Sequence, residues 1–91
     1  MRIAVLTTSK LTAAYPKRTI PAKCTEILTD NPRICKYAEN NYIKCSEVSL
    51  NYAVENADYV IILCSRKASK LGLLIGKCNR FKKSFEVVLI E

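Results

Sequence analysis

Two short polar segments of the chain contain residues whose side chains could bind an anion. Each segment follows a run of apolar residues, at positions 3–6 and 59–64. The segments supply hydroxyl groups and cations, namely Thr8, Ser9 and Lys10 in the first and Ser65, Arg66 and Lys67 in the second. Hydroxyl groups, cations and backbone amides are the groups that hold phosphate in proteins. These six residues are therefore the predicted ligand-binding residues.

The elements that must position these residues follow from the apolar runs. We expect four strands, at residues 2–7, 42–47, 59–64 and 85–90, and helices at residues 21–29, 33–39, 46–56 and 68–83. Alternating strands and helices indicate an α/β fold, with helices on both faces of a parallel sheet. The two most apolar strands should lie in the centre, and residues 42–47 should form an edge. We therefore predict one small flavodoxin-like or Rossmann-like domain over residues 1–91, with strand order 2-1-3-4.

This strand order brings the two polar segments together. The first and third strands would be neighbours, and ligands of such sheets bind beyond the carboxyl ends of the strands, where the order reverses. The second segment also precedes the helix predicted at residues 68–83, whose N-terminus attracts negative charge. The prediction is a small binding module for a phosphate-bearing ligand, either a nucleotide or nucleic acid. The alternative is that both loops only cap their helices and face water.

Enzyme function is not favoured by the remaining motifs. The segment that starts at Cys64, with sequence CSRKASK, is similar to the thiol phosphate cradle of low-molecular-weight phosphatases. It differs in having Lys70 where that cradle has arginine, in lacking glycine, and in following the third strand instead of the first. A small enzyme that depends on Cys64 therefore remains an alternative, and no catalytic residue is predicted.

No metal or cofactor is predicted either. The chain has no histidine, and none of its eight acidic residues follows a predicted inner strand. Clustered carboxylates at that position are typical of metal-dependent phosphohydrolases. Residues 72–78 resemble a phosphate-binding loop, but they have one residue too few between the glycines and lie within a predicted helix.

Positive charge is concentrated in one part of the chain. The chain has a net charge of +7, and all its acidic residues lie outside residues 59–85. The predicted basic surface consists of Lys70, Lys77, Arg80 and Lys83. It could bind nucleic acid, or an acidic partner if the chain is a protein-interaction subunit. A solvated helix face is the other interpretation.

Two glycines interrupt the same helix. Glycine disfavours a helix interior, so Gly72 and Gly76 predict close approach of another backbone. We expect a neighbouring helix of the same chain there, with a homodimer or another partner as the alternative.

The five cysteines form no recognisable metal motif, because their spacing includes no C-x-x-C. We expect Cys45 and Cys78 to be buried thiols that pack as small apolar side chains. A disulfide between Cys24 and Cys35 is an alternative.

The longest apolar runs are too short to cross a bilayer, and residues 1–10 do not form a secretory signal. We therefore expect a cytoplasmic protein without a membrane partner.

Overall fold

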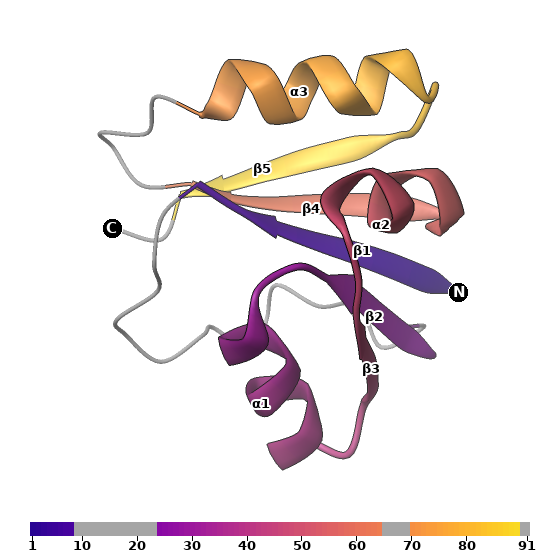
Figure 1. Cartoon of the computed structure of the whole chain (residues 1–91), viewed down its shortest axis with the longest axis vertical. Helices are drawn as coiled ribbons and strands as arrows, with labels where there is room; N and C mark the ends of the chain where they lie inside the picture. The colour runs from indigo at the N-terminus through magenta and orange to yellow at the C-terminus, as the bar shows by residue number, and fades with distance from the viewer. Residues whose placement is uncertain (9–23, 65–69, 90–91) are drawn as a thin grey trace.

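The computed structural model describes residues 1–8, 24–64 and 70–89. Five parallel strands form one sheet in the order β3-β2-β1-β4-β5. The strands are β1 (Arg2–Thr7), β2 (Glu26–Thr29), β3 (Lys44–Glu47), β4 (Tyr59–Cys64) and β5 (Phe85–Leu89). The described helices are α1 (Pro32–Asn40), α2 (Leu50–Asn56) and α3 (Leu71–Arg80). Figure 1 shows β1 in the middle of the sheet, between β2 and β4.

The prediction of an α/β fold with a parallel sheet is confirmed, but the predicted number and order of strands are wrong. Residues 26–29 form strand β2, where a helix over residues 21–29 was expected. Strand β2 lies between β1 and β3, so the edge strand predicted at residues 42–47 does not contact β1. The physical reason is the shortness of β2. Its side chains Ile27 and Leu28 are 0% and 3% exposed on opposite faces, and four residues are too few to show a strand period.

The central pairing of the sheet is as predicted. Strands β1 and β4 are parallel neighbours, paired from Ile3 with Tyr59 to Thr7 with Leu63. Four consecutive residues of β1, from Ile3 to Leu6, are 0% exposed. A strand whose residues are apolar on both faces must have both faces covered, and this requirement places β1 in the centre.

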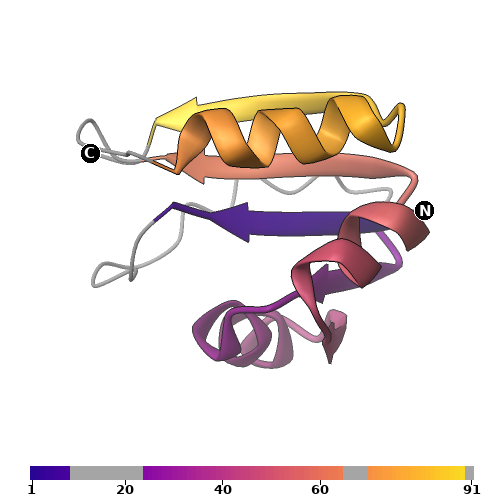
Figure 2. The ribbon, with the colours of Figure 1, turned by 45° about the horizontal axis from the view of Figure 1, so that its top comes forward.

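The helices cover both faces of the sheet. On one face, α2 and α3 pack against Ala4, Leu6 and Ile62 through side chains that include Val54 and Leu74. On the other face, α1 packs against alternate residues of the same strands, through Ile34 and Ala38. Figure 2 shows α2 and α3 on their shared face. None of the described helices is long and apolar enough to cross a bilayer.

The described helices begin and end at residues that differ from those predicted. Helix α2 begins after Ser49, whose hydroxyl accepts a hydrogen bond from the Tyr52 amide at 3.3 Å. The predicted cap, Ser46, lies in β3 instead, where its hydroxyl donates to Glu26 at 3.0 Å. Helix α3 is shorter than the predicted helix at residues 68–83, of which residues 68 and 69 lie outside the described part.

Helices α1 and α3 each end in a turn of the same type, although neither turn contains glycine. Tyr42 and Lys82 have left-handed backbone conformations, with φ of 59° and 55°. The next amide donates back to the helix, from Ile43 to the Ala38 carbonyl and from Lys83 to the Cys78 carbonyl, each at 2.8–2.9 Å. This is the Schellman arrangement, and each turn leads directly towards the following edge strand.

Gly72 and Gly76 do not have the close neighbour that was predicted. A Cβ atom built on either glycine would meet no other atom within 4 Å. Both residues are exposed, as is Leu73 between them at 60%. The expectation that another helix of this chain packs closely on the two glycines is therefore wrong for the described residues.

Candidate functional site

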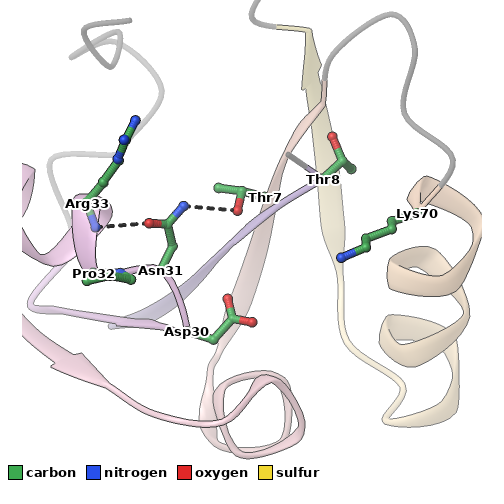
Figure 3. A pocket seen from close by; sticks show the side chains of 7 residues that line it. All are labelled: Thr7, Thr8, Asp30, Asn31, Pro32, Arg33 and Lys70. Atoms are coloured by element: carbon green, nitrogen blue, oxygen red, sulfur yellow. Dashed lines mark hydrogen bonds between the residues drawn. The ribbon is translucent and has the colours of Figure 1, made fainter. Parts of the chain in front are cut away.

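A pocket of about 390 Å³ lies beyond the carboxyl ends of β1 and β2. It is lined by the end of β1, the residue after β2, the start of α1 and the residue before α3, namely Thr7, Thr8, Asp30, Asn31, Pro32, Arg33 and Lys70. Figure 3 shows these side chains around the strand ends, at the start of α1 and beside α3. The position is the one at which open parallel sheets bind ligands, next to the strand where the order reverses.

The pocket lies where pairing between β1 and β2 stops. The two strands pair from Arg2 with Glu26 only as far as Ala4 with Leu28. One residue later, the Thr29 hydroxyl donates a hydrogen bond to the Val5 carbonyl at 2.8 Å, and Thr29 is fully buried. Side-chain bonds thus replace the backbone ladder at this end of the sheet. On the other side, β1 stays paired with β4 as far as Thr7.

Asn31 links the strand ends to helix α1. Its side-chain amide donates to the Thr7 hydroxyl at 3.2 Å, and its side-chain oxygen accepts from the Arg33 amide at 2.9 Å. The second bond caps α1, and Pro32 occupies the first turn, where the missing N–H removes no helical bond. Figure 3 shows Asn31 in this bridging position. The cap therefore fixes the start of α1, and with it the base of Arg33, against β1.

Three charged side chains line the pocket. Asp30 follows β2, Arg33 lies in the first turn of α1, and Lys70 is the residue before α3. All three are exposed, so each can reach a ligand from solvent. Figure 3 shows Lys70 pointing from α3 towards the strands. The two cations and one carboxylate give this set of side chains a net positive charge, which favours an anionic ligand that also has hydrogen-bond donors.

Of the six predicted ligand-binding residues, only Thr8 lies in the described part of the chain. It does line the pocket, but it is 8% exposed, and its amide and hydroxyl both donate to the Leu63 carbonyl, at 3.1 and 3.4 Å. Thr8 thus extends the pairing of β1 with β4. The other five lie outside the described residues, namely Ser9, Lys10, Ser65, Arg66 and Lys67.

The predicted basic surface divides into different environments. Lys70 lines the pocket, whereas Lys77 donates to the Asn51 side chain of α2 at 2.6 Å. Arg80 is exposed at the end of α3, and Lys83 is half-buried beyond the turn that ends this helix. The four cations therefore lie in different surroundings.

Sequence reasoning missed Thr7 and the four residues from Asp30 to Arg33. The sequence Asn31-Pro32 does contain a helix-start signal, a capping side chain followed by proline at the first helical position. That signal was interpreted as the end of a preceding helix, because β2 was not recognised. For the same reason, no acidic residue was expected after an inner strand, whereas Asp30 directly follows β2, which lies between β1 and β3.

Cys64 is buried at the end of a central strand. It is the last residue of β4, it is 6% exposed, and it is not among the residues that line the pocket. Cys78 belongs to α3 and is fully buried on the side of this helix that faces the core, as expected for a thiol that packs as an apolar side chain. Within residues 1–8, 24–64 and 70–89, no three Cys, Asp or Glu side chains gather closely enough to hold a metal ion.

Comparisons of the chain with models of protein families, with curated proteins and with solved structures gave no match.

Proposed function

We propose that this protein binds a small phosphate-bearing ligand, with a nucleotide as the best fit, in the pocket beyond the carboxyl ends of β1 and β2. The observation that carries the proposal is that two cations, Arg33 and Lys70, line one pocket, although they come from the starts of two different helices. Its volume of about 390 Å³ falls within the range of small-molecule sites, about 300–1,000 Å³.

Side chains, more than helix amides, would hold the phosphate. The Arg33 amide at the start of α1 already donates to the Asn31 side chain, so it is not available to a ligand. The Arg33 guanidinium and the Lys70 ammonium can supply charged hydrogen bonds to phosphate oxygens, with lysine acting as a point charge. The Thr7 hydroxyl accepts from Asn31 and, as a hydroxyl, can still donate its own hydrogen to a ligand.

Asp30 favours a nucleotide over free phosphate. An ionised carboxylate only accepts hydrogen bonds and repels phosphate, so its presence in the pocket suits a ligand that also carries hydroxyl groups. A ribose supplies two such neighbouring hydroxyls. The order β3-β2-β1-β4-β5 also corresponds to five strands of the dinucleotide-binding order 3-2-1-4-5-6, in which an acidic residue binds the ribose. The glycine-rich phosphate loop of that fold is absent, because the chain has only two glycines and both lie in α3.

A second candidate is a surface that binds nucleic acid or an acidic protein through α3. The observation in its favour is charge, because Arg80 and Lys82 are exposed cations close to the end of this helix. In this alternative the pocket has no role, and the two candidates therefore predict different effects of substitution.

Thermal unfolding and isothermal calorimetry with ATP, AMP and inorganic phosphate test the pocket. We expect AMP or ATP to raise the unfolding temperature, and Arg33→Ala and Lys70→Ala each to weaken binding by about 1.5–3 kcal/mol, the usual contribution of a charged hydrogen bond. Lys36→Ala and Arg80→Ala are the matched controls, because they remove exposed cations of α1 and α3 that do not line the pocket. Equal losses in all four variants would indicate general electrostatic attraction and contradict the proposal.

The role of Asp30 has its own comparison within the same experiment. We expect AMP to bind more tightly than its 2′,3′-dideoxy analogue, and Asp30→Asn to reduce that preference. If both ligands bind equally to the wild type while Arg33→Ala still weakens binding, the phosphate site stands and the ribose assignment fails. If ATP, AMP and inorganic phosphate all fail to bind, the proposed function fails as a whole.

A further inference from the structure

Cys35 and Cys45 bring their sulfur atoms to within 2.6 Å of each other. Cys35 lies in the first half of α1, and Cys45 is the second residue of the edge strand β3. Both side chains are partly buried, and all five cysteines of the chain are thiols in this structure. The expected alternative, a pairing of Cys35 with Cys24, is not what the structure shows, since the Cys24 thiol contacts the Glu26 carbonyl at 3.5 Å.

The contact follows from how α1 and β3 are joined. Cys45 packs with the side chains on the face of the sheet that α1 covers. The connection between the two elements is only a turn, in which the Tyr42 amide donates to the Glu39 carbonyl and the Ile43 amide to the Ala38 carbonyl. Both ends of the sulfur pair are thus held by regular structure and by a hydrogen-bonded turn between them.

The other thiols lie in different surroundings. Cys64 and Cys78 are 6% and 0% exposed in the core, on β4 and α3. Burial is the main cause that raises the pKa of Cys45, with Cys35, Glu26 and Glu47 adding to the shift. A raised pKa reduces the thiolate fraction of Cys45, and with it the rate at which Cys45 attacks a small disulfide.

We propose that Cys35 and Cys45 form a disulfide site that fastens helix α1 to the edge strand β3. The reaction partner is a small disulfide such as oxidised glutathione. The Cys35 thiolate attacks one of its sulfur atoms, a mixed disulfide forms, and one glutathione thiol leaves. The Cys45 sulfur, after losing its proton to water or buffer, then attacks the Cys35 sulfur and releases the second glutathione thiol. Two protein thiols are oxidised to one disulfide, and one small disulfide is reduced to two thiols.

The bond would join an edge strand to a helix that carries residues of the pocket. Strand β3 has a neighbouring strand on one side only, and α1 carries Asn31, Pro32 and Arg33 of the pocket at its start. Closing a short loop removes freedom from the unfolded chain, so the oxidised protein should be the more stable form. The inference does not depend on the proposed ligand.

Proteolysis and mass spectrometry locate the bond. The full-length protein is incubated with oxidised glutathione at about pH 8, where model thiols begin to ionise. It is then alkylated and cut with trypsin and a glutamate-specific protease. Cleavage after Arg33, Lys36, Lys44 and Glu47 isolates the two thiols in peptides 34–36 and 45–47. We expect these two peptides to appear joined, and to separate when a reductant is added.

Thermal unfolding measures the consequence. We expect oxidation to raise the unfolding temperature of the wild type by about 10 °C or more, as loops of this length predict for a domain of this size. Cys35→Ser and Cys45→Ser should lose the increase, whereas the control Cys24→Ser should keep it. A joined pair of peptides that includes Cys24 or Cys64, or only glutathione adducts on Cys35, would overturn the proposal. So would an oxidised wild type that unfolds at the same temperature as the reduced protein.

Discussion

The Thr29 hydroxyl is the residue-scale feature on which the end of the sheet depends. It is fully buried, it donates to the Val5 carbonyl at 2.8 Å, and its oxygen accepts from the Asn31 amide at 3.2 Å. A buried carbonyl that loses its donor keeps the full penalty for leaving water, about 1–3 kcal/mol. The same residue holds Asn31, and through it the start of α1.

Thr29→Val tests this role with a side chain of nearly the same shape. We expect the variant to lose about 1–3 kcal/mol of unfolding free energy in urea titrations. Thr25→Val is the matched control, because the Thr25 hydroxyl also donates to a carbonyl, that of Met1 at 3.0 Å, but in an exposed position. Its expected loss is under about 1 kcal/mol, as water can replace the bond. Similar losses in both variants would mean that the Thr29 bond has no special importance.

At this scale, sequence reasoning selected few of the residues that line the pocket. Thr8 was predicted as a ligand-binding residue and Lys70 as part of the basic surface, and both line the pocket. Asn31 was not selected, because its function depends on Thr7, which lies 24 positions earlier and becomes a neighbour only through strand pairing. A capping side chain can be predicted from local sequence, whereas a bond between two strand ends cannot.

Helix α3 contains two exposed glycines that its described surroundings do not explain. Gly72 and Gly76 lie in its exposed side, their φ values are not positive, and nothing stands near where a Cβ atom would be. Glycine in a helix interior costs about 0.5–1 kcal/mol relative to alanine, because the unfolded chain has more freedom to lose. Packing within residues 1–8, 24–64 and 70–89 therefore gives no reason for either glycine.

Gly72→Ala and Gly76→Ala should each stabilise the protein by about 0.5–1 kcal/mol, with additive effects in the double variant. Urea titration of the single and double variants measures this. Leu73→Ala, at 60% exposure on the same helix, is the control for a change of side chain without a change of backbone freedom. A loss of stability in either glycine variant at high protein concentration, but not at low concentration, would show instead that this side of α3 closes on a second copy of the chain.

The elements themselves were predicted to the extent that they are long and apolar. Strands β1 and β4 are continuous apolar runs, which favours central positions in the sheet, and helix α3 is long enough to show its helical period. Strand β2 has only four residues, and the first of them is the acidic Glu26. Its assignment as a strand comes from pairing on both sides, with β1 and β3, and this information is not contained in a local stretch of sequence.

The charge of the whole molecule does not by itself separate the two functional candidates. A chain with a net charge of +7 attracts any polyanion, so weak binding to RNA is expected even if the pocket is the functional site. Such binding weakens steeply as salt is added, because each phosphate contact releases counterions.

Fluorescence anisotropy with a labelled single-stranded RNA at about 50 mM salt and above measures this slope. If α3 is a nucleic-acid surface, the double variant Arg80→Ala, Lys82→Ala should reduce the salt slope by roughly 0.7–0.9 for each phosphate contact that is lost. Lys36→Ala on α1, on the opposite face of the sheet, is the control and should change the slope less. No binding at about 50 mM salt would exclude the nucleic-acid candidate and leave the pocket unaffected.

The central position of β1 also has a consequence for biosynthesis. Of the described strands, β1 leaves the ribosome first, and its residues Ile3 to Leu6 are completely buried in the finished sheet. It pairs with β2 early, but its pairing with β4 begins with Ile3 opposite Tyr59 and must wait until that part of the chain has been made. Contacts between such distant segments form slowly. The units α1–β3 and α3–β5 are instead joined by local turns, so they can form as soon as they are synthesised. The strand that is made first therefore stays without one of its two neighbours until β4 has been made, and during that interval its apolar residues are open to aggregation.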